Sequence, residues 1–483
     1  MTTGNEGDMG SSADGLNTRL KPGSVGVLAI ATIVLSSVAP LGAVVGGSPI
    51  VFGAAGVGAP AAYLLVGGLF LLFSVGYIAM SKHVVSAGGF VAYAAKGFGP
   101  RAGSMLGGVA LLAYFSLIAG LWGFFSGISG FILEGTFGFA PEPLVSFVVL
   151  LALVTALIYY GVDLSVKILV VLLSLELFIL IVLSGAILLQ GGASGIEMKS
   201  FDLGNLFTPG IGIAFLFATT CFTGFEGTVV FSEEARDPEK TIPRAAYLSI
   251  IFIAVFYTTV TWALGIGYGA EAVQEVANND PEGFVFALSP QYVGDWHMTA
   301  MNLLILTSLL AMFIGFHSIV SRYLFALARA GLLPAGLGKT NAADGNPQRA
   351  ALTVSFVTLL IVGIFLIAGA DPLAVIYQWF VALGTVSIQL VLIFASISML
   401  AFFRREQVDQ RIWHTRIAPG IAAIGFTTIC TIAVINYDFL LGGQGGIARW
   451  MLVGIPLLAL TGWMIGSSRI AAGEKLDLER IKG

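Results

Sequence analysis

Thr220-Cys221-Phe222-Thr223-Gly224-Phe225-Glu226-Gly227 is the stretch that decides the fold, and it lies inside an apolar run from about residue 207 to residue 231. A run of this length is predicted to cross a bilayer as a helix. Glycines, threonines and a carboxylate near its middle indicate that this helix is broken. A broken helix leaves backbone N–H and C=O groups without partners, and hydrocarbon supplies none. We therefore expect the break to face a cavity that holds water or a small molecule.

The composition is typical of a membrane protein. Of the 483 residues, 57% are hydrophobic and only 10% are charged, and the mean hydropathy is +0.94. Apolar runs of about 20 residues predict spanning helices. On this basis we predict an all-α polytopic membrane protein with twelve transmembrane helices, which begin near residues 24, 58, 101, 143, 164, 208, 245, 299, 349, 374, 418 and 450.

The predicted organisation has four parts. Residues 1–20 are polar and are expected to form a disordered cytoplasmic tail. Residues 21–403 hold the first ten helices, and residues 404–470 hold helices eleven and twelve, for which we expect peripheral packing or a dimer contact. Residues 471–483 form a second cytoplasmic tail.

The basic residues predict the orientation. With a cytoplasmic N-terminus and twelve crossings, only Lys199 and Arg449 of the 23 basic residues fall on the outer side. Basic residues concentrate in cytoplasmic loops, and one helix more or fewer would invert every later loop. We therefore predict a multi-pass protein of the cell membrane with both termini in the cytoplasm.

The first apolar segment carries a second predicted break, around Ser36, Ser37, Pro40 and Gly42. Pro40 has no N–H to donate and disturbs the preceding turn. A simple proline kink is the alternative interpretation. The pairing with segment six favours a true break, because segments one and six each begin a group of five, about 24–190 and 208–403. Inverted five-helix repeats with discontinuous helices place a binding site between them.

Three other segments carry polar candidates. Tyr114 belongs to a polar stripe on segment three that either lines the cavity or packs against neighbouring helices. Glu176 lies deep inside segment five, where a carboxyl group must be protonated, paired or open to water. His317 shares a helix face with Ser321, close to Ser318, so it is either a proton relay or a core histidine.

Several kinds of chemistry have no signal in the sequence. Cys221 and Cys430 lie in apolar segments and suggest neither a disulfide nor a metal site. We find no nucleotide-binding loop and no paired nucleophile and base. We therefore expect no enzyme activity, no cofactor, no metal and no nucleic-acid partner.

Two stretches carry a family resemblance. The first joins Phe222-Thr223-Gly224-Phe225-Glu226 to Glu233-Glu234-Ala235-Arg236-Asp237-Pro238 and Ile242-Pro243-Arg244-Ala245, and the second is Ser321-Arg322-Tyr323-Leu324-Phe325-Ala326-Leu327-Ala328-Arg329-Ala330-Gly331-Leu332-Leu333-Pro334. On these residues the chain resembles the amino acid–polyamine–organocation transporter superfamily over residues 20 to 470. The resemblance implies a LeuT-like fold of five-plus-five inverted repeats.

The resemblance also implies the site residues. Substrate is expected at the unwound parts of helices one and six and at an aromatic of helix eight, which correspond here to Ser36, Ser37, Val38, Ala39, Pro40, Gly42, Phe222, Thr223, Gly224, Phe225, Glu226 and Phe316. The carboxylate that matches Glu226 gates, couples or contacts a cationic substrate in relatives. The chain departs from the family in lacking a Gly-Ser-Gly-like run in helix one and in carrying Glu176 where several proton-coupled relatives carry a lysine.

Our favoured hypothesis is a symporter that imports amino acids or related organic amines, driven by protons exchanged at Glu176 and Glu226. The missing Gly-Ser-Gly-like run and the two acidic residues without a basic partner favour cationic or carboxylate-free amines such as polyamines. Sodium coupling through Glu176, His317 and Ser318, exchange transport, and a passive channel are the alternatives. We expect a monomer or homodimer in a lipid bilayer.

Overall fold

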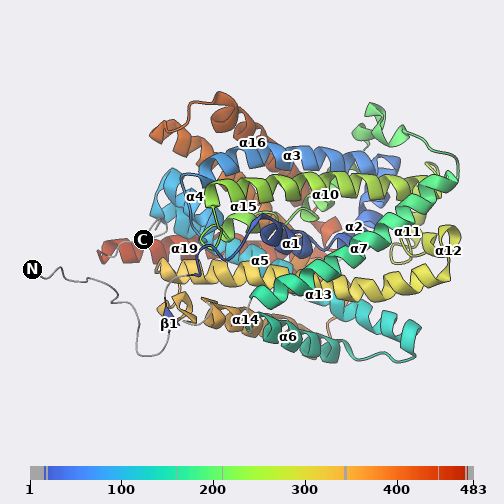
Figure 1. Cartoon of the computed structure of the whole chain (residues 1–483), viewed down its shortest axis with the longest axis horizontal. Helices are drawn as coiled ribbons and strands as arrows, with labels where there is room; N and C mark the ends of the chain where they lie inside the picture. Colours follow the sequence, from blue (N-terminus) through green and yellow to red (C-terminus); the bar gives the residue numbers. More distant parts are fainter. Residues whose placement is uncertain are drawn as a thin grey trace, which may run out of the picture.

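The computed structural model describes residues 16–17, 20–159, 162–208, 210–341, 345–443, 445–473 and 476. Most of its long helices lie side by side along the longest axis of the molecule (Figure 1). Among the described residues, the strands are limited to β1 (Leu16–Asn17) and β2 (Thr340–Asn341), which pair in antiparallel orientation.

Ten helices form the bulk of the molecule. They are α3 (Ala59–Ser81), α5 (Pro100–Phe137), α6 (Pro143–Tyr159), α7 (Val162–Gln190), α10 (Pro238–Tyr268), α13 (Asp295–Arg329), α14 (Gln348–Ile367), α15 (Gln378–Glu406), α16 (Ala418–Ile435) and α19 (Gly454–Ala471). In the described part of the chain, nine continuous stretches are long and apolar enough to span a membrane, and Pro143–Tyr159 and Ile211–Thr220 are shorter apolar helices. Each predicted apolar segment coincides with one of these helices or with an interrupted helix.

Short elements connect the long helices. They are α4 (Gly89–Phe98), α11 (Val273–Asn279), α12 (Leu288–Tyr292), α17 (Tyr437–Leu440) and α18 (Gly445–Ala448), the 3-10 turns η1 (Gly56–Gly58), η2 (Lys199–Phe201), η3 (Leu203–Phe207), η4 (Ala335–Gly338) and η7 (Arg449–Val453), and the wide turns η5 (Pro372–Tyr377) and η6 (Trp413–Ile417).

Burial separates the central helices from the peripheral ones. In the most apolar part of α13, 72% of the residues are buried, whereas the corresponding value for the stretch that contains α19 is 11%. The outward side chains of α19 include Leu457, Leu460 and Met464, all more than half exposed. Exposed apolar side chains on long, closed helices are what a bilayer requires. The chain is therefore a mostly helical, multi-pass membrane protein.

The first predicted break is present between α1 (Val27–Val38) and α2 (Pro40–Ala55). Ala39 joins them with a φ of +48°, which is rare for a residue with a side chain. Pro40 begins α2 because its missing N–H costs nothing in a first turn. The Ala39 N–H instead donates to the Ser36 carbonyl at 3.0 Å.

The second break separates α8 (Ile211–Thr220) from α9 (Gly227–Val230). Gly224 lies in this turn with a φ of +118°, a conformation that requires glycine. A Cβ atom added at Gly224 would lie 2.7 Å from Ser37 Oγ of the first interrupted helix. The two breaks therefore meet at close range.

The predicted tails are only partly described. Leu16 and Asn17 differ from the expected disorder, because their backbone pairs with β2, and Leu20 is buried. The other residues of the 1–20 tail, and most of 471–483, lie outside the described residues.

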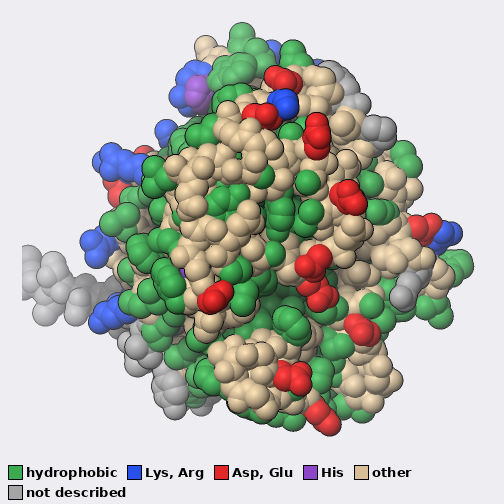
Figure 2. Space-filling model, turned by 90° about the vertical axis from the view of Figure 1, so that its right-hand side faces the viewer, with side chains coloured by type: hydrophobic (Ala, Val, Ile, Leu, Met, Phe, Trp, Pro, Cys, Tyr) green, Lys and Arg blue, Asp and Glu red, His purple; other side chains and the backbone are tan. Residues whose placement is uncertain are grey.

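The two ends of the helical bundle differ in charge. Figure 2 shows the end that carries α11 and α12, where acidic side chains gather over the loops. We call this the acidic end. The opposite end holds β1 and α4 (Figure 1), with Lys96 in the last turn of α4 and Arg101 in the first turn of α5, and we call it the basic end.

Candidate functional site

A cavity of about 90 Å³ lies where the two interrupted helices meet. One water needs roughly 10–15 Å³ in this measure, so the cavity has room for several waters or a small organic molecule. Its walls come from α1, α2, α5, α8, α13, η5 and α15. The lining residues are Ser37, Val38, Ala39, Gly42, Ala43, Gly46, Gly47, Leu117, Leu121, Phe124, Phe217, Thr220, Cys221, Thr223, Leu309, Met312, Phe316, Tyr377 and Val381.

Six of the predicted binding residues belong to this lining, namely Ser37, Val38, Ala39, Gly42, Thr223 and Phe316. Ser36, Pro40, Tyr114, Phe222, Gly224, Phe225 and Glu226 do not belong to it. Phe222 and Phe225 instead pack on the Phe70 ring, each with ring centroids 5.0 Å apart. These two rings therefore pack the turn against α3. Substrate binding by the seven residues outside the lining stays a prediction.

Glu226 is buried beside the second break with a complete set of donors. Its Oε2 accepts the Gly224 N–H at 2.8 Å, and its Oε1 accepts the Tyr114 hydroxyl at 3.2 Å. The Tyr77 hydroxyl donates to the Glu226 backbone carbonyl at 2.8 Å. The Glu226 side chain thus bonds to the backbone of the turn that contains it. The Tyr114 hydroxyl donates to the same carboxyl group.

Glu176 is buried beside the first break. Its Oε2 accepts the Leu41 N–H of α2 at 3.2 Å and also the Ser308 hydroxyl of α13. Its Oε1 has no hydrogen-bond partner among the described atoms. The Leu41 N–H is one of the first-turn donors that a helix cannot satisfy internally. Glu176 therefore caps α2 from a different helix.

Each broken helix is thus tied to one buried carboxyl group. Glu176 holds the N-terminus of α2, and Glu226 holds the turn that follows α8. Adding or removing a proton on either group changes what it accepts from the unwound backbone. This arrangement can couple protonation to the shape of the cavity wall.

His317 and Ser318 take no part in these contacts. His317 Nε2 lies 2.8 Å from Ser355 Oγ, and its Nδ1 lies 3.1 Å from Ser321 Oγ. Ser318 donates to the Ile314 carbonyl at 2.8 Å. The predicted pairing of His317 with Ser321 on one helix face is present, whereas its role as a relay stays a prediction.

A second cavity, of about 460 Å³, adjoins the first and shares Phe217, Thr220, Tyr377 and Val381 with it. It reaches Ile50 near the end of α2 and Gly442 beyond α17. The end of α2 contacts α11, since Gln274 Nε2 donates to the Gly53 carbonyl at 3.0 Å. Because α11 lies at the acidic end (Figure 1), the lining of the second cavity extends from the central cavity toward that end.

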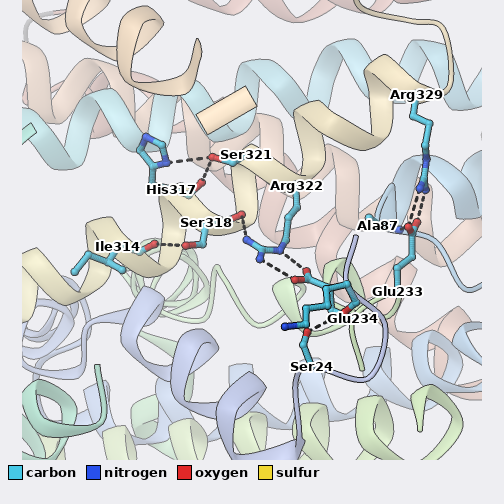
Figure 3. Close-up of polar contacts among 11 residues, drawn as sticks. Ser24, Ala87, Glu233, Glu234, Ile314, His317, Ser318, Ser321, Arg322 and Arg329 are labelled. Atoms are coloured by element: carbon cyan, nitrogen blue, oxygen red, sulfur yellow. Dashed lines mark hydrogen bonds and ion pairs between the residues drawn. The ribbon is translucent and has the colours of Figure 1, made fainter. Parts of the chain in front are cut away.

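The side toward the basic end is closed by ion pairs (Figure 3). Arg322 of α13 holds Glu234 with Nε to Oε2 at 2.5 Å and Nη2 to Oε1 at 3.0 Å, and both side chains are almost fully buried. Arg329 binds Glu233, whose Oε1 also accepts the Ala87 N–H at 3.0 Å. The Glu234 carbonyl accepts the Val25 N–H at 3.1 Å, which ties the start of α1 to the same cluster.

Sequence reasoning missed most of the apolar lining. Leu117, Leu121 and Phe124 follow one another at helical spacing on α5, and Leu309 and Met312 do so on α13. Apolar residues at this spacing form the same sequence pattern whether their helix face contacts lipid, a neighbouring helix or a cavity. Sequence reasoning assigned no role to Arg322 and Arg329, which the structure pairs with Glu234 and Glu233.

Two interrupted helices that meet at a small cavity inside a bundle of membrane helices, with buried ion pairs on one side, are typical of membrane transporters. A family model described as amino acid permease matches residues 25–466. The chain belongs to the amino acid permease family.

Individual relatives match over parts of the chain. The branched-chain amino acid permease BcaP of Lactococcus lactis subsp. cremoris is 30% identical over 44% of this chain and 43% of its own length. The amino-acid permease RocE of Bacillus subtilis is 27% identical over 57% of this chain and 58% of its own. The histidine permease of Saccharomyces cerevisiae is 26% identical over 46% of this chain and 35% of its own. The chain thus spans between about a third and three fifths of these relatives.

Proposed function

We propose that this protein is a secondary active transporter that imports amino acids by alternating access, driven by protons. The observation that carries the proposal is the pair of buried carboxyl groups, each bonded to the backbone of one broken helix. Breaks at a central cavity are a recurring construction of secondary transporters. The printed names of the relatives support amino acids as substrate.

The architecture we propose has twelve crossings and two inverted repeats of five helices, at about 24–190 and 208–403. The interruptions at the start of each group support it. In the cell membrane, the acidic end then faces outward, the basic end faces the cytoplasm, and both termini lie in the cytoplasm. In this orientation the second cavity lies on the outer side of the central cavity, and the ion pairs of Arg322 and Arg329 lie on its cytoplasmic side. A monomeric or homodimeric state of the protein stays a prediction.

Uptake into proteoliposomes tests the coupling. With purified protein, an imposed inward proton gradient should drive radiolabelled amino acid above its external concentration, and a proton ionophore should abolish the accumulation. Accumulation driven only by a sodium gradient would show that sodium, and not the proton, is the coupling ion. Equilibration without accumulation would identify a passive channel, and uptake only into vesicles preloaded with unlabelled substrate would identify an exchanger.

Related organic amines, polyamines included, are the competing substrates. The lack of a Gly-Ser-Gly-like run in helix one supports them. A thermal-shift screen of the purified protein decides between them, since a ligand that binds only the folded state raises the melting temperature. Stabilisation by amines and not by amino acids would favour an amine importer.

A further inference from the structure

The side-chain chemistry of the central cavity narrows the substrate class. None of the described side chains that line this cavity is charged, and none is an amide or an imidazole. Leu117, Leu121 and Phe124 of α5 contribute one wall. Leu309 and Met312 of α13 contribute another, and Val381 of α15 a third. A charged group brought into such a wall would lose its water without gaining a partner.

The two acidic side chains near the cavity do not change this conclusion. Glu226 is 3% exposed, and both of its oxygens already accept hydrogen bonds inside the protein. Glu176 is fully buried, and the oxygen that is bonded points at α2 and Ser308. Neither residue belongs to the cavity lining. Glu176 Oε1 has no hydrogen-bond partner among the described atoms, but it is buried and its residue lies outside the lining. A cationic side chain of a bound molecule would therefore meet no carboxylate on the cavity wall.

The polar part of the cavity comes from helix ends and from side-chain hydroxyl groups, those of Ser37, Thr220, Thr223 and Tyr377. Gly42 lies in the first turn of α2, where backbone N–H groups lack helical partners and carry partial positive charge. Ser37 and Val38 end α1, and Thr220 ends α8, where carbonyl groups carry partial negative charge. Within one cavity, these helix ends offer N–H donors to a carboxylate group and carbonyl acceptors to an ammonium group.

We infer that this site selects zwitterionic amino acids with uncharged, apolar side chains and rejects both polyamines and amino acids with charged side chains. The inference rests on the proposed function. The helix ends hold the α-carboxylate and α-ammonium groups, and the apolar walls hold the side chain.

Gly46 lies beside the apolar part of the cavity, next to Phe124. This residue lines the cavity on α2, and a Cβ atom added there would lie 3.4 Å from Phe124 Cζ and 3.8 Å from the Tyr377 hydroxyl oxygen. These are ordinary contact distances, so Gly46→Ala fits the fold and takes volume from the cavity alone. Alanine also suits a helix better than glycine.

Measuring which compounds the purified full-length protein binds tests the proposed substrate class. Leucine, valine and methionine should bind, whereas lysine, glutamate, spermidine and the two half-molecules isopentylamine and 4-methylpentanoate should not. Binding of lysine or spermidine as tight as that of leucine overturns the apolar class while leaving an amino acid or amine transporter in place. Binding of none of these compounds, combined with no uptake, removes the proposed function itself.

The Gly46→Ala variant tests whether the substrate side chain lies against Gly46 in the cavity. It should weaken leucine binding by about tenfold or more, as one misfitting methyl group does in an apolar pocket, and leave alanine binding nearly unchanged. Gly185→Ala is the matched control, because a Cβ there meets nothing within 4 Å. An equal loss for leucine and alanine, or no loss for either, would show that the side chain does not lie against Gly46.

Discussion

At the scale of single residues, the two buried glutamates differ in how completely they are bonded. Glu226 has donors on both oxygens, whereas Glu176 leaves Oε1 without a partner. Glu226 therefore fixes the turn after α8 in the conformation described, and its bonds must change if that turn moves.

The variant Glu226→Gln should abolish proton-driven accumulation while leaving the fold and substrate exchange intact. The amide keeps one acceptor for the Gly224 N–H, and the Tyr114 hydroxyl can accept from the new NH₂ group, but no proton can be exchanged. Uptake under a pH gradient and exchange between loaded vesicles measure the two activities. Wild-type accumulation in the variant would exclude Glu226 from coupling.

The ion pair between Arg322 and Glu234 gives a second residue-scale prediction. Arg322→Leu leaves a buried carboxylate unpaired, which typically costs about 3–5 kcal/mol, and the double change Arg322→Leu with Glu234→Leu should recover most of this loss. Denaturant unfolding of the purified variants measures the difference.

Arg329→Leu is the control for this ion pair, because its side chain and that of Glu233 are 23% and 16% exposed and water can screen the remaining charge. A loss for Arg322→Leu no larger than for Arg329→Leu would contradict burial as the cause.

At the scale of elements, the two interrupted helices act as one unit, since Gly224 of one break faces Ser37 of the other. Gly224→Ala adds backbone strain of about 1–3 kcal/mol at a positive φ and also a contact at 2.7 Å with Ser37 Oγ. We expect a lower melting temperature and loss of substrate binding together.

Thermal unfolding with and without substrate measures both effects of Gly224→Ala, and Gly185→Ala, in open space, should show neither. Unchanged substrate binding in Gly224→Ala would mean that the turn does not shape the site.

At the scale of the whole molecule, the central cavity continues toward the acidic end and is locked at the basic end. Cys221 is half-buried and lines the cavity, so it is a native reporter of access. A membrane-impermeant maleimide should label it from the acidic end only, and bound substrate should protect it.

Arg322→Leu should increase labelling of Cys221 from the basic end, because it weakens the lock there. Right-side-out and inside-out vesicles separate the two routes, and Cys221→Ser shows how much labelling comes from the buried Cys430. Equal labelling from both sides in the unaltered protein would contradict a closed basic end.

Local features allowed much of this protein to be predicted from sequence. Apolar run length locates the helices because a bilayer requires long hydrophobic segments. Pro40 and Gly224 locate the breaks because one lacks an N–H and the other adopts a φ closed to other residues. Five of the expected binding residues that line the cavity lie in or beside those breaks, whereas the sixth, Phe316 on α13, was expected from the family resemblance.

Only the tertiary structure decided the partners of the polar groups and the character of the cavity. Glu176 meets Leu41 from 135 residues away, Tyr114 meets Glu226 from 112, and Arg322 meets Glu234 from 88. No local pattern encodes such pairs, because packing between helices selects them. The sequence by itself therefore determined a membrane protein with two broken helices, whereas folding decided which apolar stripes turn away from lipid and enclose the site.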